Sequence, residues 1–390
     1  MSRVRVIILG QGMVAAHLAV GLERIRSGEI ETYGIPLANH PLPYRVEDIE
    51  IAASYDVDTA KVGQSLYQVA HQLIGDSFPI PEALKEISVL EGVHLGSLRG
   101  MPMTANGLEE RMTLSDAVEH LVEEWKRLNA DVFVNIISTE PAKPFPSIDE
   151  IRTAIENNAR DRISASQLYA YAVALYAQRY KPAAFINGIP VPLANDSAMV
   201  TLYEQSRAVL FGDDGATGAT PLTCDVLEHM AQRNRRVRCI SQFNIGGNTD
   251  FLALTIPERN IMKETTKSGV VSDILGYEVP NYIKPTGYLP PLGDKKFVAM
   301  HIEYVSFNGV IDELFINARI NDSPALAGTL IDLIRLGKLA IDHQVYGTIY
   351  EVNAFYMKRP GPSGTKATSK IYAFYNLLRW LEQLGYPPPA

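Results

Sequence analysis

The sequence has few of the features that mark secreted, membrane-bound or nucleic-acid-binding proteins. Among 390 residues only Cys224 and Cys239 are cysteines, so no disulfide framework is expected and a reducing cytoplasm is the expected location. No membrane-spanning segment is visible, because the apolar run at residues 4–9 is short and contains Arg5. A formal net charge of −8 argues against non-specific nucleic-acid binding. We therefore expect a cytoplasmic protein with neither a membrane nor a nucleic-acid partner.

The sequence also lacks a recognisable metal motif. Its eight histidines are scattered, and none has the HxH or HExxH spacing that brings two ligands to one metal. The apolar content of 46% and charged content of 21% are ordinary for a soluble enzyme. The length is sufficient for two domains.

What the sequence does have, at its beginning, is a strand, a glycine turn and a helix in succession. The apolar run at 4–9 is followed at once by Gly10-Gln-Gly12 and then by small, apolar residues over 13–22. This order predicts the first unit of a dinucleotide-binding fold. The third glycine of the usual fingerprint is missing, so Ala15 or Ala16 would have to allow the close contact of helix and strand.

A second strand ends in the acidic segment Ser-Tyr-Asp56-Val-Asp58. A carboxylate at this place accepts hydrogen bonds from ribose hydroxyls and repels a 2′-phosphate, which favours NAD over NADP. The spacing from the glycines is about twice the usual spacing of about twenty residues, and residues 28–45, rich in Gly and Pro, would form the intervening loop. The alternative is that Asp56 is the N-cap of a helix that starts near Thr59.

Strand and helix patterns then alternate, which predicts a parallel, doubly wound sheet. The expected helices cover 114–127, 163–178 and 221–232, and the expected strands cover 131–137, 183–187 and 208–211.

The pattern changes near residue 236, where runs of alternating apolar and polar residues predict half-exposed strands of an antiparallel sheet. Helical periodicity returns over 325–342, in a segment that could rejoin the first domain. The predicted organisation is a Rossmann domain over 1–230, an inserted α+β domain over 231–320, and a C-terminal segment over 321–390 that returns to the Rossmann domain.

Lys263 and Lys267 are separated by one helical turn if their segment is helical, so they would face the same way. Packed together and partly desolvated, each would lower the pKa of the other and leave one able to act as a neutral base. An ammonium group also suits developing alkoxides. The alternative is two solvated lysines on a polar helix.

Two glycine-containing segments carry polar side chains. Residues 212–220 precede the expected helix 221–232, where backbone N–H groups and threonine hydroxyls can form an anion cradle. The alternative is a simple turn with an N-cap threonine. Further on, Asn244, Asn248 and Asp250 flank two glycines and could hold sugar hydroxyls or satisfy a bulged turn.

Taken together, these motifs resemble the myo-inositol-1-phosphate synthase family in its shorter archaeal and bacterial form. The resemblance runs over nearly the whole chain. Its most specific elements are, in order, Asn244-Ile-Gly-Gly-Asn248-Thr-Asp250, Lys263-Glu-Thr-Thr-Lys267, Gly-Asp-Lys-Lys296 and Met-Lys358-Arg-Pro.

The resemblance implies a Rossmann fold whose inserted domain over 231–320 is the catalytic and oligomerisation domain of a homotetramer. It implies conversion of D-glucose 6-phosphate to 1L-myo-inositol 1-phosphate with tightly held NAD. In this reaction C5 is oxidised, C6 is deprotonated, the enolate attacks the C1 aldehyde, and the hydride returns to C5. The family leaves open whether a divalent or monovalent cation assists, and no metal-ligating residues are predicted.

The resemblance also implies roles for individual residues. The catalytic residues would be Lys263, Lys267, Lys296, Lys358, Asp250 and Asp322. The cofactor-binding residues would be Gly10, Gly12, Met13, Val14, Asp56, Thr139, Tyr169, Asp214 and Thr217. The substrate-binding residues would be Asn244, Asn248, Gly218 and Thr220.

Two details of this assignment of residue roles by resemblance stay open. Lys295 competes with Lys296, although the Asp-x-Lys pattern favours Lys296. The chain has Ala216 and Ala219 where longer relatives often carry Lys and Gln, so phosphate contacts there would come from the backbone, Thr217 and Thr220.

Two other functions are alternatives to this reaction. One is an NAD-dependent dehydrogenase of a phosphorylated small molecule with a related two-domain fold. The chain has no cysteine paired with a histidine as a nucleophile, which disfavours the acylating dehydrogenases. The other is a non-catalytic NAD sensor, but binding alone would not need four lysines.

Overall fold

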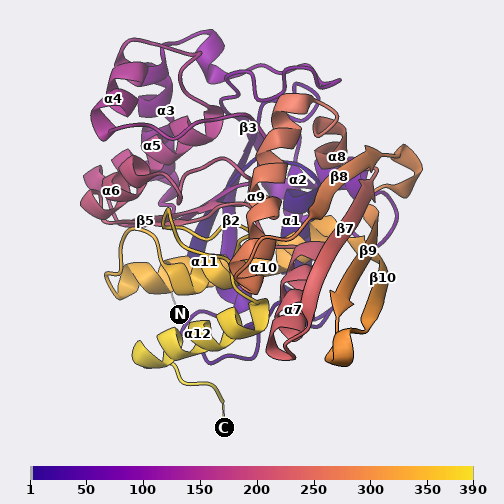
Figure 1. Cartoon of the computed structure of the whole chain (residues 1–390). Helices are drawn as coiled ribbons and strands as arrows, with labels where there is room; N and C mark the ends of the chain where they lie inside the picture. The colour runs from indigo at the N-terminus through magenta and orange to yellow at the C-terminus, as the bar shows by residue number, and fades with distance from the viewer. Residues whose placement is uncertain (1–2, 390) are drawn as a thin grey trace.

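The computed structural model describes residues 3–389, except for the side chains at positions 262 and 265–268. Within this part of the chain the strands form a larger and a smaller sheet, which stand beside each other in Figure 1. The larger sheet is parallel and has the strand order β3-β2-β1-β4-β5-β6. Its strands are β1 (Val4–Leu9), β2 (Ile49–Asp56), β3 (Val89–Glu91), β4 (Val132–Asn135), β5 (Ala183–Asn187) and β6 (Ala208–Phe211).

Helices cover both faces of this sheet, so its strands are apolar on both sides. Along β1, Val4, Val6 and Ile8 point to one hydrophobic cluster, and Ile7 and Leu9 point to the other. The helices of this part are α1 (Met13–Arg26), α2 (Leu66–Ile74), α3 (Leu114–Leu128), α4 (Ile148–Glu156), α5 (Ala165–Arg179), α6 (Ser197–Gln205) and α7 (Ala219–Gln232). The predicted doubly wound parallel sheet is confirmed.

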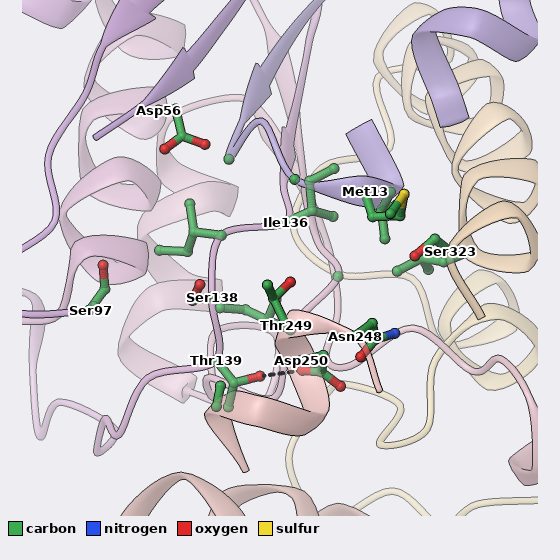
Figure 2. A pocket seen from close by; sticks show the side chains of 18 of the residues that line it. Met13, Asp56, Ser97, Ile136, Ser138, Thr139, Asn248, Thr249, Asp250 and Ser323 are labelled. Carbon is green, nitrogen blue, oxygen red and sulfur yellow. Dashed lines mark hydrogen bonds between the residues drawn. The ribbon is translucent and has the colours of Figure 1, made fainter. Parts of the chain in front are cut away.

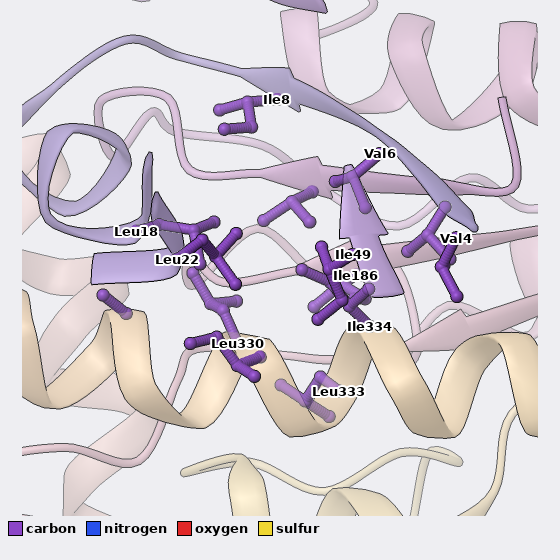
Figure 3. Close-up of a cluster of buried hydrophobic side chains, with 14 of the residues drawn as sticks. Val4, Val6, Ile8, Leu18, Leu22, Ile49, Ile186, Leu330, Leu333 and Ile334 are labelled. Carbon is purple, nitrogen blue, oxygen red and sulfur yellow. The ribbon is translucent and has the colours of Figure 1, made fainter. Parts of the chain in front are cut away.

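Helix α10 (Asp322–Asp342) returns to the larger sheet after the second one. It packs against α1 and crosses β1, β4, β5 and β6. Figure 3 shows Leu330, Leu333 and Ile334 facing the side chains of β1. The helix predicted over 325–342 is therefore present and contacts the first part of the chain, while the domain limits at 230 and 320 stay a prediction.

The smaller sheet has the order β10-β9-β7-β8 and consists of β7 (Arg236–Gly246), β8 (Asn281–Tyr288), β9 (Lys295–Val305) and β10 (Ile311–Asn321). Strand β9 is antiparallel to both of its neighbours, but β8 runs parallel to β7. The prediction of an antiparallel sheet was wrong for this one pair. The chain between β7 and β8 contains α8 (Thr249–Ala253) and α9 (Pro257–Leu275), and a connection of this length permits a parallel pair.

The smaller sheet is covered on one face only. Met300 and Ile302 of β9 are buried with Leu227 of α7 and Val271 of α9. The C-terminal helices α11 (Tyr350–Tyr356) and α12 (Lys370–Gln383) pack on each other. Among the described helices, none is both long enough and apolar enough to cross a membrane.

Candidate active site

A cavity of about 370 Å³ lies at the carboxyl ends of β1, β2 and β4. The strand order reverses between β1 and β4, which is where open α/β sheets bind their ligands. Figure 2 shows Asp56 at the end of β2, Met13 at the start of α1, and Asn248 and Asp250 of the segment before α9 around the same space. The cavity is lined by Gly10, Gly12, Met13, Val14, Asp56, Thr139, Tyr169, Asp214, Thr217, Asn248, Asp250, Lys263, Asp322 and Lys358, among others.

The two glycines of the first turn do different things. Gly10 has φ +100°, and a Cβ there would lie 2.7 Å from backbone atoms of Ile137, so only glycine fits. Gly12 is the N-cap of α1, and a Cβ there would meet no atom within 4 Å. Because no side chain caps α1, its first N–H groups are free to bind an anion in the cavity.

The carboxylate of Asp56 is held by the turn beside it. Its Oδ1 accepts hydrogen bonds from the N–H groups of Val57 and Asp58, at 2.8 and 2.9 Å. Its Oδ2 accepts from the N–H of Gln11 at 2.8 Å and from Nζ of Lys61 at 3.2 Å. No helix starts near Thr59; the next one is α2, capped by the Ser65 side chain. The N-cap alternative for Asp56 was therefore wrong.

Tyr169 closes one side of the cavity. Its hydroxyl accepts a hydrogen bond from the Val93 N–H at 2.7 Å, and the side chain is buried. Burial holds the pKa of Tyr169 well above its ordinary value, so the hydroxyl stays protonated.

At the other end of the cavity, lysines and aspartates alternate. Lys358 Nζ lies 2.8 Å from Asp214 Oδ1, and Lys263 Nζ lies 3.5 Å from the same oxygen. Lys263 Nζ also lies 3.4 Å from Asp250 Oδ2. Lys296 Nζ lies 2.8 Å from both carboxylate oxygens of Asp322. These side chains come from the loop after β6 (Asp214), from α8 (Asp250), α9 (Lys263), β9 (Lys296) and α10 (Asp322), and from the segment after α11 (Lys358).

The environments of these groups shift their pKa values in different directions. Burial works against the charge on Lys263, but Asp214, Asp250 and Asp322 outweigh it and hold the Lys263 pKa above its ordinary value. Burial lowers the pKa of Lys358, an effect that Asp214 partly offsets and Lys263 strengthens. Burial alone would raise the pKa of Asp322, but Lys296, Lys358 and Lys263 together keep it below its ordinary value.

These shifts correct two expectations about the lysine pair on α9. Lys263 is buried, so the alternative of a solvated lysine is wrong for it. Its pKa is raised and not lowered as expected for the pair, so Lys263 does not serve as the neutral base; among the described lysines of the site, Lys358 has a lowered pKa. The side chain of Lys267 lies outside the described residues.

A recess of about 20 Å³ adjoins the cavity at the N-terminus of α7. Thr220, Asn244 and Lys296 line it. Gly218 is the N-cap of α7 with φ +62°, and a Cβ there would collide with the side chains of Lys296 and Asp322. No side chain caps α7, so the alternative of a turn with an N-cap threonine was wrong. In the first turn Pro221 has no N–H and the Thr220 N–H donates to the Thr217 carbonyl at 3.4 Å, which leaves the Ala219 N–H to face an anion.

Strand β9 separates the two neighbouring lysines by its alternation. Lys296 is 8% exposed and points to Asp322, whereas Lys295 is exposed to solvent. The structure therefore places Lys296, and not Lys295, in the site. Thr217 also contacts Asp322, its Oγ1 donating to Oδ1 at 3.2 Å.

The two asparagines are already engaged in the fold. Asn248 caps α8 by accepting from the Phe251 N–H, and its amide donates to Asp294 Oδ1 at 2.9 Å. Asn244 donates to the Lys284 carbonyl and accepts from Gln242. The alternative of a turn that satisfies itself thus describes Asn248 well, although Asn248 lines the cavity and Asn244 lines the recess.

Three residues that support the site were missed at the level of sequence. Asp213 accepts hydrogen bonds from the N–H groups of Leu193 and Asn195 and so fixes the segment that carries Asp214; burial raises its pKa to about 6. Asp294 accepts from the N–H and hydroxyl of Ser323 at the start of α10, and the Gly-Asp-Lys-Lys segment could have indicated it. Arg259 contacts two loops, and no local signal indicates this.

Among the described residues, no three His, Cys, Asp or Glu side chains are grouped so that they could hold a metal ion. The fold and the cavity together define an enzyme of the doubly wound α/β class. A glycine turn suited to a dinucleotide lies at one end of its cavity, and a cluster of paired lysines and aspartates lies at the other.

Comparison with known proteins identifies the family. The family model of myo-inositol-1-phosphate synthase matches residues 218–323. An inositol-3-phosphate synthase of Corynebacterium glutamicum is 30% identical over 377 residues, covering 92% of this chain and 94% of the relative. An inositol-3-phosphate synthase of Mycobacterium tuberculosis is 27% identical over 372 residues, covering 92% and 91%.

A solved structure extends the similarity to the whole chain. The crystal structure of a myo-inositol-1-phosphate synthase-related protein from Thermotoga maritima is 55% identical, covers all of both chains and has a TM-score of 0.93. The chain belongs to the myo-inositol-1-phosphate synthase family.

Proposed function

We propose that the chain is a myo-inositol-1-phosphate synthase that converts D-glucose 6-phosphate to 1L-myo-inositol 1-phosphate with NAD. The observation that carries the proposal is the cluster of Lys263, Lys296 and Lys358 with their aspartates, placed in the cavity of a Rossmann fold. The reaction passes through oxyanions and a phosphorylated sugar, both of which need nearby cations. The family membership supports the same reaction and does not favour the alternative of a dehydrogenase.

The residues at the glycine end fit NAD. Gly12 leaves space in front of the uncapped α1, where the pyrophosphate would meet N–H groups. Asp56 lies at the end of β2 with its carboxylate oriented by Gln11, where it would accept from ribose hydroxyls. Met13, Val14, Thr139 and Tyr169 would line the remaining surface. When bound, NAD supplies a group that takes up one hydride and later returns it.

The chain's own residues would bind the phosphate and move the protons. The Ala219 N–H at the start of α7, the Thr220 hydroxyl and Lys296 would hold the phosphate in the recess. Lys263, held charged by its aspartates, would stabilise negative charge on the C5 oxygen. Lys358, whose pKa is lowered, would exchange the proton of the C5 hydroxyl. Lys267 would complete the cluster by family resemblance.

The assembly is a further part of the proposal. Phe243, Tyr282 and Phe315 lie on the face of the smaller sheet opposite its buried side, and each is exposed. An exposed apolar patch of this kind suits a subunit contact, and we propose a homotetramer built through it. Sedimentation equilibrium of the wild type and of Phe315→Asp tests this, and an unchanged monomer in both would contradict it.

Product analysis tests the reaction itself. The protein is incubated with glucose 6-phosphate and a trace of NAD, and the products are identified by NMR. The synthase forms inositol phosphate without accumulating NADH. Accumulation of NADH would indicate a dehydrogenase, and binding without turnover would indicate a sensor.

A further inference from the structure

Arg259 is a buried cation that lies behind the cavity wall without touching the cavity. It belongs to the first turn of α9 and is 2% exposed. Its Nη1 donates to the Thr139 carbonyl at 2.9 Å, and its Nη2 donates to the Arg99 carbonyl at 2.8 Å. Both hydrogen bonds link it to loops more than a hundred residues away in the sequence, and both loops line the cofactor end of the cavity.

Thr139 and Arg259 belong to a closed circuit of contacts. The Thr139 hydroxyl donates to Asp250 Oδ1 at 3.4 Å, as the dashed line in Figure 2 shows. The other oxygen of Asp250 lies 3.4 Å from Lys263 Nζ. Lys263 follows Arg259 by one helical turn on α9, so the circuit returns to the helix on which it began.

The contacts of this circuit place strict requirements on the side chain at position 259. A buried guanidinium is costly unless its donors are satisfied, and here it donates to two backbone carbonyls on separate loops. The planar fork of arginine can reach two such acceptors at once, which the single ammonium of lysine does less well. Burial lowers the pKa of Arg259, an effect that the charge of Glu140, next to Thr139, partly offsets. The energy of burying this charge is recovered only while both loops stay against α9.

We propose that Arg259 is a positioning residue that locks the two cofactor-side loops onto the helix bearing Lys263. Occupancy of the dinucleotide site and correct placement of the lysine cluster then depend on each other. The inference rests on the proposed function, because it assigns NAD to the loops and catalysis to Lys263.

The test compares Arg259→Met, Arg259→Lys and the control Arg99→Ala. The control removes an exposed side chain and keeps the carbonyl that Arg259 uses. Displacement of a catalytic group by about 1 Å can cost up to about a hundredfold in rate. We therefore expect Arg259→Met to raise the NAD Kd about tenfold and to lower kcat at saturating NAD about tenfold or more. Arg259→Lys should recover part of both, and Arg99→Ala should change neither.

A double-variant cycle separates positioning from general support of the fold. If Arg259 acts through Lys263, Arg259→Met should lower kcat much less in a Lys263→Met background than in the wild type. Thermal unfolding monitored by circular dichroism tests whether each variant is folded. If Arg259→Met is not folded, the NAD Kd and kcat of Arg259→Lys are compared with those of the wild type instead.

Three outcomes overturn the inference. The first is that the folded Arg259 variants, with Met and with Lys, keep the NAD Kd and the kcat of the wild type. The second is an equal loss of kcat in both backgrounds of the cycle. The third is a wild type that fails to bind NAD or to turn over glucose 6-phosphate, which would remove the proposed function and this inference with it.

Discussion

The two ends of the cavity present their binding groups in different ways. At the glycine end, the groups are backbone N–H donors of α1 and a carboxylate oriented by neighbouring N–H groups. At the lysine end, the groups are charged side chains from elements distributed over the chain, each held by an opposite charge. The first end depends on the local shape of one turn, whereas the second depends on the mutual balance of charges. Changes at the lysine end should therefore affect chemistry most, and changes at the glycine end should affect cofactor binding most.

The largest expected effect follows the replacement Lys358→Met. It removes the lysine whose pKa is lowered and leaves Asp214 with one contact fewer. General acid–base groups contribute about 10²- to 10⁴-fold, so we expect kcat to fall about 10³-fold. The NAD Kd, measured by fluorescence titration, should stay within about twofold if the loss of Lys358 at the lysine end does not affect cofactor binding at the glycine end. Lys366→Ala, at an exposed lysine nearby, is the control; turnover of Lys358→Met within tenfold of the wild type would contradict the assignment.

The next effect concerns the glycine end alone. Gly12→Ala adds a methyl group that meets no protein atom, at a φ of −95° that alanine adopts readily. We expect the Tm to stay unchanged while the NAD Kd rises on the order of a hundredfold, because the backbone can no longer approach the pyrophosphate closely.

Gly10→Ala is the matched comparison for that turn. With φ +100° and a clash with the backbone of Ile137, it should lower the free energy of unfolding by about 2 kcal/mol or more. If Gly12→Ala binds NAD as the wild type does, the pyrophosphate does not lie at this turn.

A smaller effect is expected for Gly218→Ala, because Gly218 has a positive φ and lies against the charged pair Lys296 and Asp322. Gly218→Ala places a methyl group against Lys296 and Asp322, so kcat should fall about tenfold as this pair shifts. The left-handed backbone adds a cost of about 1–2 kcal/mol in the free energy of unfolding. Gly276→Ala has φ +75° and open space around its Cβ, so it should show the cost in stability without the loss of kcat. Equal kcat values for the two variants would mean that the Lys296–Asp322 geometry does not matter.

The contrast between local turn geometry at the glycine end and long-range charge pairing at the lysine end explains what could be predicted from the sequence. The strand, turn and helix around Gly10 are encoded by adjacent residues, so the parallel sheet and the turn were predicted correctly. The direction of β8 was not, because periodicity reports which residues are buried and not which way a strand runs. The motifs selected the lysines and the aspartates, but which of them pair could not be predicted. Asp214 and Lys358 are 144 residues apart, and that long-range contact partly offsets the lowering of the Lys358 pKa by burial.

The smallest expected effect tests the charge balance by pH. Burial and the neighbouring charge of Lys263 lower the pKa of Lys358 from 10.5, so the alkaline limb of kcat should lie below that of an ordinary lysine. Lys263→Met removes the repelling charge and one of the cations that compete with Lys358 for Asp214, and both changes raise the pKa of Lys358. The alkaline limb should therefore move to higher pH by about one unit, while the remaining kcat is lower. The pH–rate profile of kcat measures this shift, with Lys295→Met at the exposed neighbouring lysine as the control. A limb that moves to lower pH, or does not move, would mean that Lys263 does not control the protonation of Lys358, and that the lysines act as separate groups.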